Sequence, residues 1–346
     1  MIRRLPAEWE PQQAVMLTWP RVDGPFAPRS DAVTANFLAI ATAIGRRQGL
    51  WISVDRNVAA LEKYLLDHGV PAEHLKLTEL PNNDVWVRDH GPITTVTEQG
   101  LLHLDFQFNG WGGKHPCARD NAINRGLAAA GTLEAPLETL DWIMEGGAID
   151  VDGAGSLLTT EHCVLSETRN GGSRANFEAV VAKQLGIERV LWLTEGGLEG
   201  DDTDGHVDTL ARFCDPQTIV FQSCGRPDDS HHESLTRMAE ELAALRTADG
   251  VPYHLVPLPL PAANYDESGK RLPASYANFL IINGAVLVPT YGDVADAEAL
   301  DTLRNCFPGR EIIGIDCRTL IHQYGSLHCV TMQIPAADLP LAAAGN

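Results

Sequence analysis

Four stretches of the chain share one pattern, in which two apolar runs flank a tight turn. They are residues 92–106, 148–160, 208–223 and 278–293, and their turns hold Gln-Gly, Asp-Gly, Asp-Pro and Asn-Gly. Turn residues of this kind between apolar runs favour β-hairpins. Each stretch therefore predicts two antiparallel strands.

A segment with helical spacing follows each predicted hairpin, and usually a short apolar strand comes next. Residues 175–186 and 231–248 predict helices, because their apolar positions recur every three to four residues. Residues 188–193 and 253–258 predict the strands that follow. A unit that recurs at roughly sixty residues indicates a modular array.

Two single apolar strands near the ends of the chain, 13–20 and 328–335, have no hairpin partner in sequence. A helix at 34–47 and a strand at 50–54 follow the first of them. Pairing of the two end strands would close the array into a ring and remove its exposed sheet edges. No stretch reads as a linker, so we expect a single α/β domain over residues 1–346. Its fold would be a five-bladed α/β propeller with one blade shared between the N- and C-terminal segments.

The composition is that of a globular protein, with 44% hydrophobic residues among 346. Eighteen apolar residues never stand together, and no apolar run follows the first arginines, so we expect neither secretion nor membrane spanning. Seven scattered cysteines without a C-x-x-C pair favour a reduced, cytoplasmic protein. The sequence leaves a homo-oligomer open.

The formal charge of −20 at pH 7 makes nucleic acid a poor partner, because affinity for phosphate backbones comes largely from Lys and Arg. The same charge suits a small cationic ligand. An acidic balance is also common for solubility alone.

Charged or reactive residues gather next to glycine at the start of predicted strands. The clusters are 82–92, 145–147, 201–208 and 326–329. They contain a cysteine nucleophile, Cys329, a general acid and base, His206, and three carboxylates, Asp89, Glu145 and Asp208. Two carboxylates can hold the nitrogens of a guanidinium while a thiolate attacks its carbon. In a ring these clusters would face one cavity and form a thiol hydrolase.

Each of these residues has an ordinary structural explanation as well. A cysteine at the head of an apolar strand is usually a core residue. His206 alone would be a satisfied structural histidine, and Asp204 before Gly205 a turn. Asp89 could pair with its neighbour Arg88. The functional interpretation depends on the residues acting together.

The motifs WVRD-x-GP, EGG, TRN, T-D-G-H-V-D-x-x-x-R-F and H-C-x-T-x-Q closely resemble those of the agmatine deiminases. These belong to the guanidine-modifying (pentein) superfamily, which includes bacterial-type peptidylarginine deiminases. The resemblance runs from EWEPQQ at residue 8 to the last strand. It implies a five-fold α/β propeller and hydrolysis of agmatine to N-carbamoylputrescine and ammonia in putrescine biosynthesis, with no cofactor and no metal.

The resemblance also implies a role for each site residue. Cys329 is the nucleophile that forms an amidino-cysteine, and His206 protonates the departing ammonia and then activates water. Asp89 and Asp208 hold the guanidinium, and Glu145 orients His206 or shares that grip. Trp86 and the loop at Trp111 resemble the wall of the substrate channel. The two cationic ends of agmatine also suit a channel that bears the acids Asp84 and Asp204. One departure, residues 323–327 (Gln-Tyr-Gly-Ser-Leu), puts the shape of the channel for the substrate's tail in doubt.

Several other functions remain open. A zinc hydrolase would draw on His206 and Asp208, on His162-Cys163 or on 231–233, but none has the spacing that fixes zinc ligands on one face. A non-catalytic polyamine-binding protein would explain the acidity. Peptidylarginine or free-arginine deimination and amidino transfer to an amine are further alternatives.

We expect agmatine to be preferred over free arginine. The α-carboxylate of arginine needs a cation, and the only arginine of the clusters is Arg88. Alternation along a strand would turn Arg88 away from the cavity that Asp89 faces.

Overall fold

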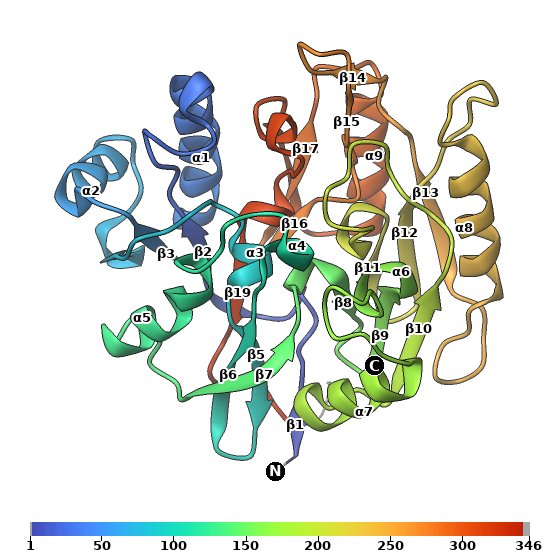
Figure 1. Cartoon of the computed structure of the whole chain (residues 1–346), viewed down its shortest axis with the longest axis horizontal. Helices are drawn as coiled ribbons and strands as arrows, with labels where there is room; N and C mark the ends of the chain where they lie inside the picture. The colour runs from blue at the N-terminus through green and yellow to red at the C-terminus, as the bar shows by residue number, and fades with distance from the viewer. Residues whose placement is uncertain (1, 342–346) are drawn as a thin grey trace.

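The computed structural model describes residues 2–341 of an α/β protein, in which five sheets share one arrangement (Figure 1). In each, two antiparallel strands are followed by a strand that runs parallel to the second. Four of the antiparallel pairs are hairpins, and all four were predicted from the sequence. They are β5 (Ile93–Thr97) with β6 (Gly100–Gln107), β8 (Ile149–Val151) with β9 (Ser156–Thr160), β11 (Ala211–Asp215) with β12 (Thr218–Gln222), and β16 (Leu280–Ile282) with β17 (Ala285–Thr290).

The parallel third strand of each hairpin sheet comes after an intervening segment. These strands are β7 (Leu137–Ile143), β10 (Arg189–Leu193), β13 (His254–Leu258) and β18 (Glu311–Asp316). Two neighbouring parallel strands need such a crossover connection, because a tight turn reverses the chain direction and can join only antiparallel strands. The strands predicted at 188–193 and 253–258 are confirmed as β10 and β13.

Strands from the two ends of the described chain form the fifth sheet, in the order β19 (Met332–Pro335), β2 (Gln12–Thr18), β3 (Gly49–Val54) and β4 (Leu75–Glu79). The pair β19 and β2 is antiparallel, with Met332 opposite Met16. This confirms the predicted pairing of the two end strands. Three short strands complete the set: β1 (Arg3–Arg4), which pairs with β5, and the hairpin β14 (Asn264–Tyr265) with β15 (Arg271–Leu272).

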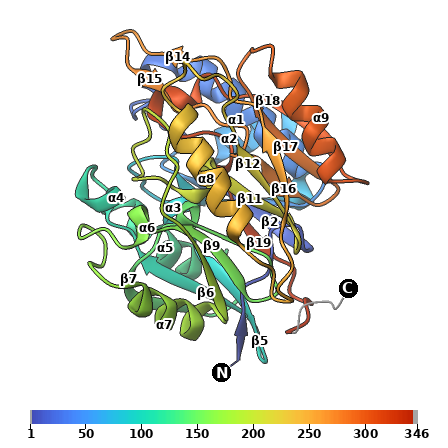
Figure 2. The same cartoon turned by 90° about the vertical axis from the view of Figure 1, so that its right-hand side faces the viewer.

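The longer helices α1, α7, α8 and α9 lie on the outside of the molecule, and strands such as β8, β11, β16 and β19 lie toward its middle (Figures 1 and 2). The helices are α1 (Ser30–Gly45), α2 (Val58–Asp67), α3 (Val87–His90), α4 (Gly110–Gly113), α5 (Ile123–Ala129), α6 (Glu161–Val164), α7 (Arg174–Leu185), α8 (His232–Ala244) and α9 (Asp296–Cys306). In α1, Val33, Phe37, Ile40 and Ile44 are buried on one face, which explains its helical spacing. Predicted helix 231–248 ends earlier, at Ala244.

The end of α7 shows why the sequence stops the helix there. Gly186 follows α7 with φ of 72°, a left-handed conformation that glycine adopts at low cost. A β-carbon at this position would also lie 1.9 Å from the carbonyl oxygen of Arg3. The glycine therefore ends the helix and admits β1 beside it.

The largest hydrophobic core cluster joins α1, β2 and β3 to β16, β17 and α9, and it includes Trp86, Trp111 and Cys329. The wall of the candidate site is thus continuous with the core. Within residues 2–341, no helix combines the length and the apolar character that crossing a bilayer requires.

Candidate active site

Four short helical turns contain the predicted catalytic residues or directly follow them, and each turn lies just before the first strand of an antiparallel pair. They are α3 before β5, and the 3-10 helices η4 (Gly146–Ala148) before β8, η5 (Val207–Thr209) before β11 and η7 (His328–Val330) before β19. Helix α3 contacts both η4 and η7, and η4 contacts η5. The structure therefore brings together the clusters that the sequence singled out.

Cys329 is buried in η7, and its thiol lies among oxygen acceptors. Its Sγ is 3.8 Å from Oδ2 of Asp208 and 3.4 Å from Oδ1 of Asn278. Asn278 Oδ1 also accepts from the backbone N–H of His328 at 2.9 Å, which anchors the turn. Burial raises the pKa of Cys329 well above its usual range, and the charges of Asp208 and Asp89 raise it further. The resting group is a thiol, and a nearby cation would favour the thiolate.

His206 is buried between two carboxylates. Its Nε2 is 3.4 Å from Oε2 of Glu145, and its Nδ1 is 3.5 Å from Oδ1 of Asp89. Burial opposes the charged ring, but the carboxylates of Asp89 and Glu145 outweigh it, so the pKa of His206 lies well above its usual range. The ring is therefore protonated at neutral pH and can act as a general acid.

Asp89 in α3 is fixed by two donors. Nε1 of Trp111 donates to its Oδ2 at 2.8 Å, and the backbone N–H of Gly147 donates to its Oδ1 at 3.1 Å. Burial raises the pKa of Asp89 to about 6 despite these hydrogen bonds and the charge of His206. At neutral pH this carboxylate is ionised, but the surrounding groups offset its negative charge only in part.

In Asp208 and in Glu145, one carboxylate oxygen accepts a hydrogen bond and the other does not. His328 Nδ1 donates to Oδ2 of Asp208 at 2.8 Å, and Arg169 Nε donates to Oε2 of Glu145 at 2.6 Å. The second oxygens, Oδ1 of Asp208 and Oε1 of Glu145, are buried and find no hydrogen-bond partner within the described chain. Burial alone would raise both pKa values. The pKa of Asp208 is lowered by His328, and that of Glu145 by His206 and Arg169. Buried acceptors of this kind fit a ligand rich in N–H donors.

A cavity of about 200 Å³ opens onto Cys329. It is lined by Pro25, Asp84, Trp86, Asp89, Trp111, His115, Asp202, Thr203, Gln323, Tyr324, Gly325 and Cys329. Of the predicted channel residues, Asp84, Trp86 and Trp111 lie in this lining. Asp204 does not line this cavity. Its two carboxylate oxygens accept hydrogen bonds from Lys114 and Arg169, both at 2.8 Å.

The unusual segment 323–327 forms part of the cavity wall. A β-carbon at Gly325 would lie 2.3 Å from the ring of Trp86, so only glycine allows this close approach. Tyr324 has a left-handed φ of 68°, and Nζ of Lys270 lies 4.0 Å from the centre of its ring. The departure from the family pattern therefore falls on the wall next to Trp86.

Arg88 points away from this cavity, as predicted, but the predicted reason is wrong. It lies in helix α3 and not in a strand, so strand alternation does not set its direction. Its Nη1 donates to Oε1 of Gln333 at 2.7 Å, and its Nη2 lies 3.6 Å from Oε2 of Glu8. Arg88 lines a separate cavity of about 40 Å³, whose lining shares no residue with the larger one.

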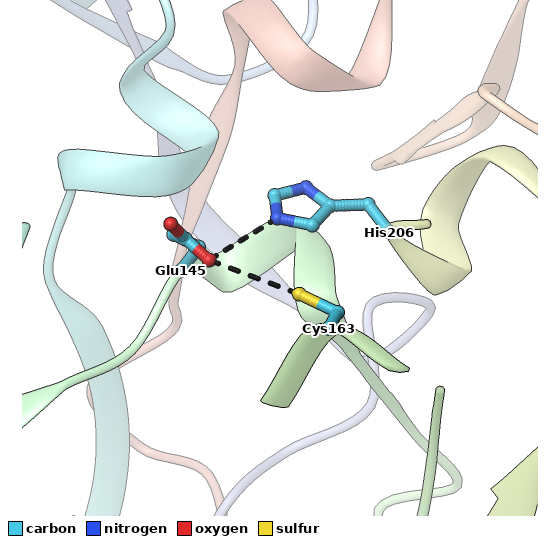
Figure 3. A group of neighbouring side chains, drawn as sticks. All are labelled: Glu145, Cys163 and His206. Carbon is cyan, nitrogen blue, oxygen red and sulfur yellow. Dashed lines mark hydrogen bonds and ion pairs between the residues drawn. The ribbon is translucent and has the colours of Figure 1, made fainter. Parts of the chain in front are cut away.

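Within residues 2–341, one group of side chains has spacing that would suit a metal ion: Glu145, Cys163 and His206 (Figure 3). Of the side chains considered for a zinc hydrolase, His206 and Cys163 belong to this group, and Asp208, His162, His231, His232 and Glu233 do not. The guanidinium of Arg169 lies 2.6 Å from the Glu145 oxygen that faces the group. Burial also raises the pKa of the Cys163 thiol. A cation beside the ligands and a protonated thiol both oppose metal binding, so these contacts favour a hydrogen-bonded acid and base group.

Four residues near the site were not predicted to have a role. They are Glu8, Arg169, Asn278 and His328. Arg169 is the arginine of the TRN motif, and His328 precedes the cysteine. Asn278 stands directly before the fourth hairpin, the same position as the other clusters, and that regularity could have identified it. Glu8 left no comparable signal.

Comparisons with known proteins agree with one another. The family model described as Porphyromonas-type peptidyl-arginine deiminase matches residues 4–335. The agmatine deiminase of Pseudomonas aeruginosa (strain LESB58) is 32% identical, covering 96% of this chain and 95% of its own. A Porphyromonas gingivalis structure with the provisional name arginine deiminase is 48% identical, covering 97% and 99% of the two chains with a TM-score of 0.90. A cysteine-to-serine variant of C. jejuni agmatine deiminase with substrate bound is 32% identical, covering 97% of both chains with a TM-score of 0.89.

Proposed function

This chain belongs to the Porphyromonas-type peptidyl-arginine deiminase family, and on that basis we propose that it is an agmatine deiminase. It would hydrolyse agmatine to N-carbamoylputrescine and ammonia without a cofactor, in putrescine biosynthesis. One observation carries the proposal: a thiol, Cys329, lies beside buried carboxylates at the base of a cavity. The named relatives from P. aeruginosa and C. jejuni support agmatine as the substrate.

The reaction begins with the two carboxylates Asp89 and Asp208 binding the guanidinium nitrogens. The positive charge of the bound guanidinium offsets the two carboxylates that raise the pKa of Cys329, so the thiol releases its proton to solvent and the thiolate forms when substrate is present. The Sγ then attacks the guanidinium carbon and forms a C–S bond. Binding in this geometry makes the attack effectively unimolecular.

Loss of ammonia requires a proton, and His206 is placed to supply it. One C–N bond breaks, the departing nitrogen takes the proton of His206, and an amidino-cysteine remains. Water then gives a proton back to His206 and adds to the same carbon. The C–S bond then breaks as the hydroxyl of the adduct loses its proton and becomes the carbonyl group, which releases the ureido product. The departing thiolate takes up a proton and returns to the resting thiol. Glu145, 3.4 Å from Nε2, orients the ring through both halves of the reaction.

The cavity suits a substrate with a cation at each end. Asp84 and Asp202 lie in its lining together with Trp86 and Trp111, and no Lys or Arg is found among the described residues of that lining. Burial raises the pKa of Asp84 to about 6, so it is ionised at neutral pH and available to a cation. Asp204 would act indirectly, through Arg169 and the adjacent loop. An α-carboxylate in this cavity would meet carboxylates and lack a cationic partner.

A second candidate is deimination of arginine, free or in a peptide. It is supported by the P. gingivalis structure, which is more similar in sequence to this chain and has the provisional name arginine deiminase. The neutral backbone of a peptide would escape the repulsion that excludes free arginine, and only the width of the channel at 323–325 would reject it. The third candidate is a polyamine-binding protein that catalyses no reaction.

A panel of agmatine, free arginine and arginyl peptides, measured as ureido product and ammonia, tests the proposal. We expect kcat/KM for agmatine to exceed that for arginine by about a hundredfold, because burying an unpaired charge typically costs several kcal/mol. Comparable values for the two would contradict the agmatine assignment, and efficient turnover of the peptide would establish the second candidate. Absence of ammonia with every guanidine would support the binding protein.

We further propose that residues 1–346 form one domain, a closed five-bladed α/β propeller. The five sheets of common topology support this, as does the pairing of β19 with β2. A cytoplasmic location is supported by the seven cysteines, which are all unpaired in the structure.

A further inference from the structure

A buried series of three side chains runs behind the thiol: Asp208, His328 and Glu8. His328 Nδ1 is 2.8 Å from Oδ2 of Asp208, and its Nε2 is 2.7 Å from Oε2 of Glu8. All three residues are at most 5% exposed. Glu8 precedes β2 and His328 precedes β19, so the paired strands at the two ends of the described chain hold the series together.

The hydrogen-bond partners of His328 determine the charge of its ring. An ionised carboxylate can only accept a hydrogen bond. Because each ring nitrogen of His328 faces a carboxylate oxygen, both nitrogens must donate, and the ring then carries a positive charge. Hydrogen bonds between ionised partners are about twice as strong as neutral ones. His328 therefore serves as a rigid cationic link between two anions.

Other groups offset the negative charge of Glu8, the member of the series that lies farthest from the thiol. Glu8 accepts from Nη2 of Arg212 at 3.1 Å and from the backbone N–H of Ile281 at 2.7 Å, and Nη2 of Arg88 lies 3.6 Å away. Burial opposes the charge of Glu8, but His328 and Arg212 outweigh it and lower its pKa. Glu8 is thus a fixed anion that anchors His328.

The near end leaves Asp208 oriented but incompletely satisfied. Its Oδ2 is engaged by His328, while its Oδ1 has no hydrogen-bond partner in the part of the chain that the structure describes. We propose that His328 and Glu8 are positioning residues, which keep Asp208 ionised and turned so that Oδ1 accepts from the substrate's guanidinium. The choice of substrate in this statement rests on the proposed function, whereas the anchoring applies to any cationic ligand.

Other charged or titratable groups surround the series. Cys329, His206 and Asp89 lie near Asp208, while Arg212 and Arg88 face Glu8, with Asp150 beside Arg212. Arg212 Nε donates to Asp150 Oδ1 at 3.0 Å, so Asp150 already compensates part of its charge. Neither arginine makes a hydrogen bond to Asp208 within residues 2–341, and its direct cationic contact is His328.

Two variants separate the hydrogen bonds from the charge. His328→Asn keeps a donor near the place of Nδ1 but removes the positive charge and the contact with Glu8. Glu8→Gln keeps an acceptor for Nε2 but removes the anchoring anion. Each should lower kcat/KM for agmatine by about tenfold to a hundredfold, the range expected for small misplacement of a binding group. KM should rise more than kcat falls.

The pH profile gives a readout that a purely structural role would not change. Burial raises the pKa of Asp208, and His328 is the largest influence that lowers it. Without the cation this pKa rises, and Asp208 must be ionised to bind a guanidinium. The acid limb of kcat/KM should therefore move to higher pH in His328→Asn, and to a smaller extent in Glu8→Gln. The double variant should be no worse than His328→Asn alone, because the two residues act as one unit.

Glu10→Gln is the matched control. Glu10 lies two residues from Glu8 and pairs with Arg4 at 2.6 Å, with no link to Asp208. Its substitution should lower thermal stability at most, with the pH profile unchanged. An unmoved acid limb in both test variants, or additive losses in the double variant, would overturn the proposal.

Alkylation of Cys329 by iodoacetamide, followed by mass spectrometry at each pH, provides a test that does not require turnover. Removing the cation next to the thiol should move the alkylation profile of His328→Asn to higher pH, and Glu10→Gln should match the wild type. If the wild-type protein forms no ureido product, the proposed function fails, and the alkylation profile still decides the positioning role. Identical profiles for His328→Asn and wild type would contradict it.

Discussion

Gly147 allows His206 to lie against the backbone of η4: a β-carbon at position 147 would be 2.5 Å from Nδ1 of His206 and 2.8 Å from Oδ1 of Asp89. Real side chains do not tolerate such distances, so the ring or the carboxylate would have to move. The second glycine of the EGG motif thus sets the distance between His206 and Asp89, the proposed general acid and one of the carboxylates proposed to bind the guanidinium.

Gly147→Ala should therefore reduce kcat/KM by about a hundredfold, because displacement of about 1 Å at a reacting group can cost that much. Overpacking should lower the free energy of unfolding by about 1–3 kcal/mol. Steady-state kinetics and denaturant unfolding measure the two effects. Gly225→Ala is the control, since nothing in the described chain lies within 4 Å of its β-carbon. Full activity of Gly147→Ala would show that the ring has room to shift.

Cys329→Ser should abolish turnover while agmatine still binds, as measured by calorimetry. A serine hydroxyl is far harder to ionise than a thiol, so the carboxylates and His206 remain without a nucleophile. Mass spectrometry of quenched wild-type enzyme should show the amidino adduct on Cys329. Cys117→Ser, at a half-buried site on the Phe108 carbonyl, should keep normal activity. Turnover by Cys329→Ser would refute the assignment of the nucleophile.

Asp89→Asn and Asp208→Asn should each lower kcat/KM by about tenfold to a hundredfold. A hydrogen bond to a charged group contributes about 1.5 to 3 kcal/mol, and loss of one carboxylate also misaligns the guanidinium carbon. Asp67→Asn, on the exposed end of α2, controls for the change in net charge. Near-normal kinetics in both site variants would mean that other groups bind the guanidinium.

The activity should fall as the pH drops through about 6. Burial raises the pKa of Asp89 to about 6, and the protonated form cannot hold a cation. Trp111 donates to this carboxylate and stabilises its ionised form, so Trp111→Phe should raise the pKa and move the acid limb of kcat/KM to higher pH. The limb in kcat should lie at lower pH than the limb in kcat/KM, because bound guanidinium favours ionised Asp89. An acid limb unaffected by Trp111→Phe would assign it to another group.

The same titration affects stability. The pKa of Asp89 in the folded protein, about 6, exceeds the ordinary value of 3.8, so the folded state binds more protons between these values. Asp89 therefore destabilises the folded protein progressively as pH rises through this window. In Asp89→Asn this contribution disappears, and the difference in melting temperature between variant and wild type should grow from pH 4 to pH 7.

Local patterns predicted the hairpins well, because strand alternation and turn chemistry act over a few residues. They failed for Arg88 and Asp89, which were expected to alternate along a strand but lie in helix α3. All four residues of α3, Val87 to His90, are buried, so every side of this turn faces protein. The turn therefore has no exposed polar face, and the sequence lacks the alternation of polar and apolar residues by which a helix is recognised.

The candidate site was predictable where its residues lie at the start of predicted strands, as Cys329, His206 and Asp208 do. It was not predictable where long-range pairs decide, since Glu8 and His328 are separated by 320 positions. Asp204 illustrates the same limit. Its carboxylate is engaged by Arg169 and Lys114, and neither contact follows from the turn in which it lies.

The pairing of β19 with β2 also bears on biosynthesis. A ribosome makes β2 early, but its antiparallel partner is the last strand of the described chain to emerge. Until then one edge of β2 is open to other chains, a recognised aggregation hazard. The turn with Cys329 immediately precedes β19, so the proposed nucleophile is also positioned late. Nascent chains that have formed four of the five sheets would thus hold the carboxylates and His206 but not this thiol, and the proposed site would be complete only after β19 has been made.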